Sequence, residues 1–222
     1  MRPVRFGLIG YGKVAQLHAQ ALKEAANAQL VSVCGRTKAR RDAFADTWEI
    51  PSRMHVEEMV MKDNVEAVII TTPHPRHKAD TLSACSAGCH VLVEKPMAIT
   101  TSDCDEMISA AASQNLLLGV VSQRRWYPSC ARIRSAIDQG SLGTPSLAQV
   151  TILGWRDEAY YASDPWRGRW DTEGGGVLIN QAPHQIDLMC WYMGEPECVL
   201  GFWDNYTHPY IEVEDSAAAI VR

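Results

Sequence analysis

Residues 5–15 constrain the fold more than any other part of the chain. The segment Arg5–Ile9, which is apolar from Phe6 onward, has the character of a strand, and it breaks at Gly10 and Gly12 before a helix-compatible segment begins. Gly10 can adopt backbone angles that a side chain forbids, and Gly12 lets the main chain approach a ligand closely. The small side chain of Ala15 lets the helix lie against the strand. The segment therefore predicts a strand, a tight turn and the start of a helix.

This G-x-G-x-x-A pattern predicts a dinucleotide site. The first turn of such a helix directs unpaired N–H groups and the positive end of its dipole at the turn, which suits a pyrophosphate. The motif alone is a weak signal, and its position directly after an apolar strand strengthens it. An ordinary turn that binds nothing is the alternative. We expect Lys13 and Val14, which follow Gly12, to belong to the cofactor site with the two glycines.

Composition excludes several classes of protein. With 222 residues and 46% apolar content, the chain can bury the cores of one or two domains. Its net charge of −5 argues against a nucleic-acid partner. No apolar run approaches the ~20 residues of a membrane span, and the N-terminus lacks a signal-peptide pattern. We therefore expect a cytoplasmic protein without a membrane partner.

The seven cysteines are scattered, and none forms a C-x-x-C pair. Cys85, Cys89 and His90 are close in sequence, but a zinc site there would need further ligands. Buried reduced thiols are the favoured interpretation, and no metal is expected.

The end of the second expected strand, residues 29–34, bears on the choice of cofactor. A carboxylate at this point would bind the ribose 2′-OH of NAD, and the segment Cys34–Lys38 contains none. Arg36 can instead pair with a 2′-phosphate through two hydrogen bonds. The sequence therefore favours NADP over NAD. Alternatively, Arg36 only stacks on adenine and either cofactor binds.

Helical and strand-like segments alternate through the first half of the chain. Both faces of the strand expected at residues 67–71 are apolar, as in a parallel sheet covered by helices on each side. We predict a Rossmann domain over residues 1–122, a doubly wound parallel α/β sheet. The other expected strands of this domain lie at residues 90–93 and 116–121. Helices are expected at residues 12–26, 38–47 and 56–61. One more helix should end near residue 87, and another should begin at Ser102 or Asp103.

Two loops follow strands that should end at one edge of this sheet, where open α/β sheets bind ligands. Thr72 and Pro73 begin the first loop, in which His77 either reaches the cofactor or starts and packs a helix. Glu94 and Lys95 begin the second. Lys95 is a candidate proton donor or carbonyl polariser, or else a surface lysine.

A second domain is expected over residues 123–222, with a boundary near residues 122–125. We predict a helix near residues 131–139 and a long strand at residues 149–155. The segment 156–171 interleaves arginines with aromatic residues, Trp166 among them, which suits either a sugar-like ligand or a subunit contact.

The segment Gly174–Asp187 contains a candidate catalytic imidazole. If the chain is helical after Pro183, His184 and Asp187 share a face, so the carboxylate can orient the imidazole. Pro183 should kink or restart the helix. Asn180 is a candidate to bind a substrate hydroxyl. A helix cap or a core histidine is the alternative for His184.

Together these motifs resemble the glucose–fructose oxidoreductase/inositol dehydrogenase/rhizopine catabolism (Gfo/Idh/MocA) family. The resemblance covers essentially the whole chain and rests on the glycine turn, the Thr72-Pro73 loop, Glu94-Lys95-Pro96 and the glycine run with His184 and Asp187. It implies a Rossmann domain followed by an α+β domain with a large, open, mostly antiparallel sheet, of which we expect this chain to hold only a part. It also implies hydride transfer between NAD(P) and a carbinol of a sugar or cyclic polyol, in a homo-oligomer such as a dimer or tetramer.

The resemblance assigns roles to individual residues. Lys95 and His184 match the family's catalytic pair, and Asn180 stands where an aspartate is common, which leaves substrate positioning as its role. We expect Asp187 to be catalytic beside His184, and Arg125 and Trp166 to bind substrate with Asn180. A non-catalytic NAD(P)-binding sensor and a lyase or hydrolase that uses the nicotinamide transiently are the alternatives. The residues expected to bind the cofactor are Gly10, Gly12, Lys13, Val14, Arg36, Thr72, Pro73, His77, Glu94 and Lys95.

Family members are typically longer than 222 residues, and this chain stops inside a segment from Ser216 that reads as a strand. A truncated sheet would leave an unpaired edge, so we expect the native protein to extend past Arg222.

Overall fold

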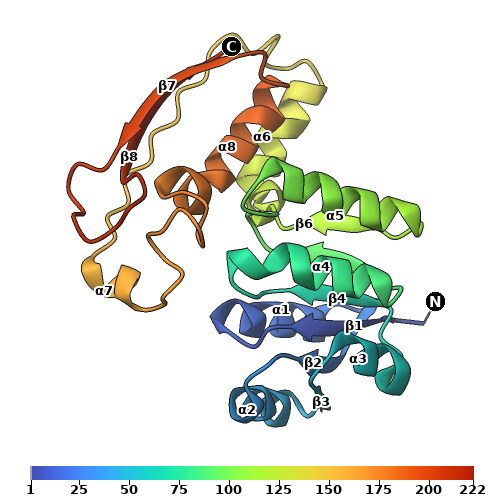
Figure 1. Ribbon diagram of the computed structural model, residues 1–222. Helices are drawn as coiled ribbons and strands as arrows, with labels where there is room; N and C mark the ends of the chain where they lie inside the picture. Colours follow the sequence, from blue (N-terminus) through green and yellow to red (C-terminus); the bar gives the residue numbers. More distant parts are fainter. Residues whose placement is uncertain (1) are drawn as a thin grey trace. The chain divides into compact units, whose positions relative to one another are not determined.

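The computed structural model describes residues 2–222, which form two compact units, the first ending at Val121 and the second beginning at Ser122. The first unit contains a parallel sheet with strand order β3-β2-β1-β4-β5-β6 (Figure 1). The doubly wound α/β prediction is confirmed. Its strands are β1 (Val4–Ile9), β2 (Ala28–Cys34), β3 (Ser52–Arg53), β4 (Ala67–Ile70), β5 (His90–Val93) and β6 (Leu118–Val120). Its helices are α1 (Lys13–Glu24), α2 (Lys38–Trp48), α3 (Val56–Asp63), η1 (His74–Arg76), α4 (His77–Ser86) and α5 (Thr101–Ser113).

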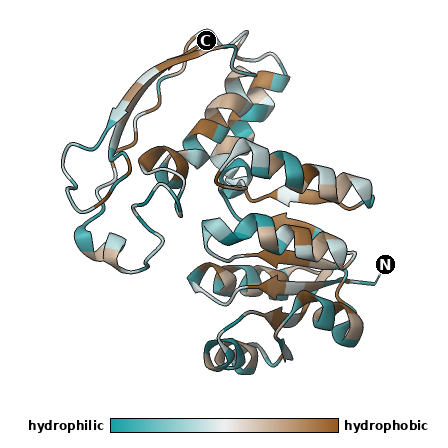
Figure 2. Ribbon diagram, viewed as in Figure 1, coloured by the Kyte–Doolittle hydropathy of each residue, from teal (hydrophilic) through white to brown (hydrophobic). Residues whose placement is uncertain are grey.

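Alternating side chains of the central strands enter two separate cores. Leu8 and Ile69 pack with residues of α1 and α2, whereas Ile9 and Ile70 pack with residues of α3, α4 and α5. Successive side chains in a strand point to opposite faces, so β4, which is buried on both faces, is apolar at every position. Figure 2 shows this as brown strands between helices of mixed colour.

The strand register brings the carboxyl ends of four strands to one level. Ile9 of β1 lies opposite Cys34 of β2 and Ile70 of β4, and Ile70 lies opposite Val93 of β5. The segments that follow these residues, starting at Gly10, Gly35, Thr71 and Glu94, therefore share one edge of the sheet.

Some boundaries differ from expectation. Helix α5 begins at Thr101, earlier than the expected Ser102 or Asp103, because the side chain of Thr100 caps it by accepting a hydrogen bond from the Asp103 N–H at 3.1 Å. The short strand β3 was not predicted from the sequence. Its two residues pair with Val33 and Cys34, and a segment this short has no periodicity to detect.

The second unit contains helices and an antiparallel hairpin. The helical restart expected at Pro183 is confirmed, because a π-helical segment ends at Gln181 and α8 begins at Pro183. The strand expected from Ser216 is also confirmed. The elements are η2 (Gln123–Trp126), α6 (Pro128–Asp138), α7 (Glu158–Ala162), η3 (Val177–Gln181), α8 (Pro183–Met193), β7 (Val199–Asp204) and β8 (Ser216–Val221).

The prediction of a long strand at residues 149–155 is wrong. This segment has no regular secondary structure, and Leu153 is 92% exposed. Its apolar residues favour a strand locally, but a strand needs a neighbour to complete its hydrogen bonds. Among residues 2–222 no strand pairs with it. Within the same described range, no helix is both long and apolar enough to cross a membrane.

Candidate active site

The glycine turn lies at the point where the strand order reverses between β1 and β4. Gly10 has φ of +107°, and a Cβ there would lie 2.7 Å from Thr71 Oγ1, so the turn requires glycine. Gly12 is the N-cap of α1. Among the described residues, no side chain caps this helix, and a Cβ at Gly12 would meet no atom within 4 Å. The backbone N–H groups at the start of α1 are thus left for a ligand, which fits the pyrophosphate of a dinucleotide.

Tyr11 shapes the adjoining end of β2. Its hydroxyl accepts a hydrogen bond from the Thr37 N–H at 3.0 Å, and the Arg40 guanidinium lies 5.5 Å from the centre of its ring. A Cβ on Gly35 would lie 2.4 Å from this ring. Arg36 is exposed just beyond the strand, where the sequence predicts contact with a 2′-phosphate.

His77 is buried at the start of α4, between two main-chain carbonyls. Its ring is 1% exposed, with Nδ1 2.8 Å from the Pro96 carbonyl oxygen and Nε2 2.8 Å from that of Thr72. A direct contact between His77 and the cofactor stays a prediction, and a protein carbonyl oxygen already lies against each ring nitrogen. The side chain links the Thr72-Pro73 loop to the Glu94-Lys95-Pro96 loop.

Lys95 follows β5 at the same edge of the sheet. Its backbone N–H donates to Glu94 Oε2 at 3.1 Å, while the Glu94 N–H continues the ladder by donating to the Ile70 carbonyl at 3.0 Å. Glu94 and Lys95, the two site residues expected after β5, thus differ in role. Glu94 fixes the main chain, and Lys95 carries the titratable amine.

In the second unit, Asp187 is paired with a residue 62 positions away. Arg125 donates to both carboxylate oxygens, from Nε at 2.8 Å and Nη2 at 2.6 Å, and its guanidinium lies 5.3 Å from the Trp191 ring centre. These hydrogen bonds to the Asp187 carboxylate raise the pKa of Arg125. Sequence spacing suggested Asp187 only as a partner of His184, and it suggested Arg125 as a substrate ligand. The pairing leaves Arg125 only its remaining N–H groups for a substrate.

His184 is the second residue of α8, next to Pro183. Its Nε2 lies 3.4 Å from Gln123 Nε2, so an amide from η2 adjoins the candidate catalytic imidazole. Gln123 was not predicted as a site residue.

Asn180 lies on the π-helical segment, and its amide Nδ2 donates to Glu173 Oε1 and, at 3.2 Å, to the Tyr160 hydroxyl. Glu173 is buried, and its other oxygen accepts from the Gly168 N–H at 2.6 Å. Burial raises the pKa of this carboxyl, while the hydrogen bonds from Gly168 and Asn180 oppose that rise. Glu173 was missed by sequence analysis. The available signal was an acidic residue directly before the glycine run.

The glycine run is explained by Glu214. Its carboxylate accepts from the Gly176 N–H at 2.8 Å and the Leu178 N–H at 3.0 Å, and the Val177 N–H donates to the Glu214 carbonyl at 3.0 Å. A Cβ on Gly176 would lie 1.8 Å from that carbonyl oxygen. The run therefore lets the chain approach Glu214 closely and sets the start of the segment that carries Asn180.

The arginines and aromatic residues of segment 156–171 largely contact one another. The Arg167 guanidinium lies 4.4 Å from the ring centres of both Trp166 and Tyr160, and its Nη1 donates to the Tyr160 hydroxyl at 2.6 Å. Trp166, expected to bind substrate, thus lies against an arginine of its own loop.

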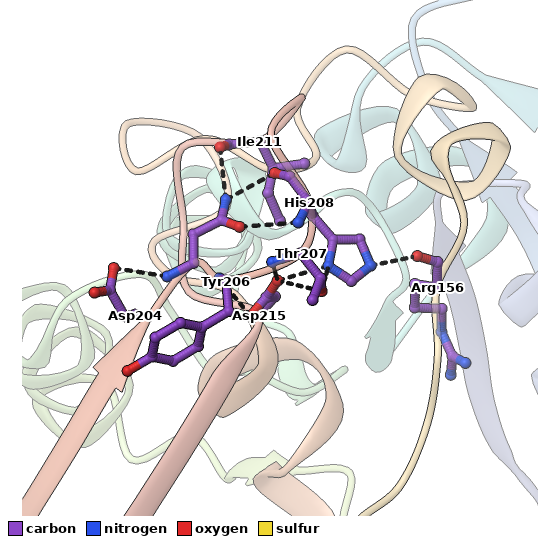
Figure 3. Close-up of polar contacts among 8 residues, drawn as sticks. Arg156, Asp204, Tyr206, Thr207, His208, Ile211 and Asp215 are labelled. Carbon is purple, nitrogen blue, oxygen red and sulfur yellow. Dashed lines mark hydrogen bonds and ion pairs between the residues drawn. The ribbon is translucent and has the colours of Figure 1, made fainter.

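Another buried imidazole, that of His208, lies in the loop between β7 and β8 (Figure 3). His208 Nδ1 lies 2.7 Å from Asp215 Oδ2, and its Nε2 lies 2.8 Å from the Arg156 carbonyl oxygen. Burial favours the neutral carboxyl of Asp215, but hydrogen bonds from His208, Tyr206 and Thr207 hold its pKa well below the usual range. Neither His208 nor Asp215 was predicted, because no local motif links them.

The cysteines are free thiols, and Cys85 and Cys89 are buried. Burial raises the pKa of the Cys89 thiol to about 11. Among residues 2–222, no cluster of histidine, cysteine and acidic side chains could hold a metal ion.

These features define a class of protein. A parallel sheet with a glycine turn where its strand order reverses, followed by the start of α1, is typical of a dinucleotide-binding α/β domain, and here a second unit of helices and an antiparallel hairpin follows it. Comparison with known families makes this specific. Residues 4–122 match the model described as "Oxidoreductase family, NAD-binding Rossmann fold", and residues 130–222 match the GFO/IDH/MocA C-terminal domain. The chain belongs to the Gfo/Idh/MocA oxidoreductase family, as its motifs predicted.

Individual relatives agree with this assignment. The chain is 31% identical to Oxidoreductase P35 of Formosa agariphila, over 87% of this chain and 62% of that protein. It is 32% identical to the 1,5-anhydro-D-fructose reductase of Ensifer adhaerens, over 86% of this chain and 57% of that protein. Among solved structures, the fold matches the crystal structure of the WlbA dehydrogenase from Bordetella pertussis in complex with NADH and UDP-GlcNAcA, with a TM-score of 0.93. The two sequences are 31% identical, and the match covers 100% of this chain and 64% of the WlbA chain. The chain thus spans about three fifths of the length of these relatives.

Proposed function

We propose that the protein is an NAD(P)-dependent dehydrogenase that transfers a hydride between a nicotinamide and a carbinol of a sugar or cyclic polyol. The observation that carries the proposal is the uncapped start of α1 behind Gly12, at the same sheet edge as the segment that bears Lys95. Membership of the Gfo/Idh/MocA family supports it. So do the names of the similar proteins, which include a reductase of 1,5-anhydro-D-fructose.

The proposed chemistry divides the work among side chains. The nicotinamide, when bound, accepts the hydride that leaves the carbinol carbon. His184 accepts the hydroxyl proton as the carbon–oxygen double bond forms, and Lys95 polarises that oxygen. Asp187, held by Arg125, supports the imidazolium that results. Asn180 binds a neighbouring substrate hydroxyl.

We propose NADP(H) as the preferred cofactor. Its support is the exposed Arg36 just after β2, together with the lack of a carboxylate in the segment Cys34–Lys38. The WlbA structure was determined with NADH, so a direct comparison of the two cofactors in this protein is the decisive measurement.

We also propose that the protein is cytoplasmic and forms a homo-oligomer, a dimer or tetramer. Exposed apolar side chains on the β7–β8 hairpin, Phe202 and Ile220 among them, support a subunit contact. Sedimentation equilibrium tests the assembly, and cell fractionation tests the location.

The experiment that tests the enzyme assignment assays the wild type, His184→Ala and Lys95→Ala by nicotinamide absorbance, on a polyol and sugar panel. Loss of a general acid–base group should lower kcat by about 10²–10⁴-fold in each variant. His90→Ala serves as the matched histidine control. Near-normal turnover in both active-site variants would overturn the assignment, and cofactor binding without any redox change would favour a sensor.

A further inference from the structure

The chain of contacts around Glu94 begins on the helix that follows the glycine turn. His18 lies on α1, and its Nε2 is 2.8 Å from Glu94 Oε1. Both side chains are largely shielded from water, with 17% of His18 and 16% of Glu94 exposed. A hydrogen bond to a carboxylate is stronger than one between neutral groups, and shielding strengthens it further. The contact therefore joins α1 firmly to the segment after β5.

Glu94 contacts both His18 and the next residue, Lys95. While Oε1 faces His18, Oε2 accepts a hydrogen bond from the backbone N–H of Lys95 at 3.1 Å. The backbone of Glu94 is itself fixed by the sheet ladder through the Ile70 carbonyl. A carboxylate held at both oxygens has little rotational freedom, so it fixes the peptide plane that precedes the Lys95 side chain.

A second histidine holds the other side of Lys95. His77 contacts the Pro96 carbonyl through Nδ1 and the Thr72 carbonyl through Nε2. The main chain on either side of Lys95 is thus held by two imidazoles, one from α1 and one from the start of α4. Of the two, His18 belongs to the helix whose first turn is suited to the cofactor pyrophosphate.

We propose that His18 is a positioning residue that connects cofactor binding to the placement of Lys95, through Glu94. This inference rests on the proposed function, in which Lys95 polarises the substrate oxygen. The start of α1 would hold the dinucleotide, which would restrain that helix. His18 holds Glu94 to the helix, and Glu94 fixes the Lys95 backbone. His18 touches neither substrate nor the reacting atoms, and acts through these contacts.

The test uses variants that differ in the donor at position 18. His18→Leu and His18→Ala remove the donor, whereas His18→Gln restores an N–H group near the place of Nε2. We expect the first two to lower kcat by roughly tenfold, the effect of losing one charge-assisted hydrogen bond. The Kd for the cofactor should change by less than about threefold, since the pyrophosphate contacts remain. His18→Gln should recover most of kcat, and His55→Ala, at an exposed histidine of the same unit, should match the wild type.

A second readout needs no turnover. Hydrogen exchange of the Lys95 amide, measured with and without NADPH, reports its bond to Glu94. We expect NADPH to slow this exchange in the wild type and in His18→Gln, but much less in His18→Leu and His18→Ala. Unchanged kcat and exchange in both donor-free variants would overturn the proposal, as would a His18→Gln variant as impaired as His18→Leu. If the wild type turns over no polyol or sugar, the proposed function fails, while the exchange data still decide the role of His18.

Discussion

The buried carboxylate of Glu173 accepts a hydrogen bond from the side-chain amide of Asn180. The second Asn180 N–H is directed at the Tyr160 hydroxyl. With both amide hydrogens committed, Asn180 can offer any further partner only its carbonyl oxygen. An aspartate, which the family commonly has at this position, would likewise offer only acceptors. Glu173 thus gives the asparagine here the hydrogen-bonding polarity of an aspartate.

The contact between Glu173 and Asn180 predicts how stability responds when the carboxylate and the amide are exchanged between these two positions. Asn180→Asp should destabilise the protein by about 2 kcal/mol, because it places a second carboxylate against Glu173. The double variant Glu173→Gln/Asn180→Asp should recover most of that loss, since the new amide donates to the new carboxylate. Urea denaturation of the wild type, both single variants and the double variant measures this coupling. Additive effects of the two substitutions would show that the pair does not interact.

The two glycines of the turn should respond differently to substitution. Gly10→Ala should lower the free energy of unfolding by about 1–3 kcal/mol, because φ is +107° and the new Cβ would contact Thr71. Gly12→Ala should fold normally, because its Cβ would meet no atom of residues 2–222 within 4 Å. Its affinity for the cofactor should nevertheless fall by roughly tenfold or more, since the methyl group enters the space a pyrophosphate needs. Thermal unfolding and NADPH fluorescence titration separate the two effects. Wild-type affinity in Gly12→Ala would contradict a cofactor site at this turn.

Arg36 should determine the preference between the two cofactors. Arg36→Ala should lower the ratio of kcat/KM for NADP to that for NAD by roughly 10- to 100-fold, the effect of losing a two-pronged phosphate contact. Lys38→Ala is the matched control, because Lys38 is paired with Asp42 at 2.5 Å. An unchanged ratio in Arg36→Ala would instead indicate that Arg36 only stacks on adenine.

Asp215 should make stability depend on pH on the acid side. Its folded-state pKa is held below the unfolded value, so its contribution is present above about pH 4 and is lost as pH falls toward the folded pKa. Asp215→Asn should therefore destabilise the protein by about 2 kcal/mol at pH 7 and progressively less below about pH 4. Urea midpoints across this range measure the effect, and Asp204→Asn, at the exposed last residue of β7, is the control. A deficit independent of pH would assign the loss to packing alone.

Local sequence patterns determined most of the first unit. The glycine turn, the helix after it and the both-faces-apolar strands are short-range features, because φ/ψ limits and burial act on neighbouring residues. Pro183 likewise fixed the helical restart, since proline lacks the N–H that a continuous helix needs. The sheet edge with Gly10, Thr72 and Lys95 followed from the rule that parallel strands end together.

The tertiary structure decided which side chains meet. Arg125 and Asp187 are 62 residues apart, and His18 and Glu94 are 76 apart, so no periodicity reveals either pair. The failed prediction of a strand at residues 149–155 has a similar cause: its apolar residues favour a strand, but no strand within residues 2–222 pairs with it. Hydrogen-bond partners and strand pairing depend on the path of the whole chain, whereas sequence patterns report only what each segment prefers by itself.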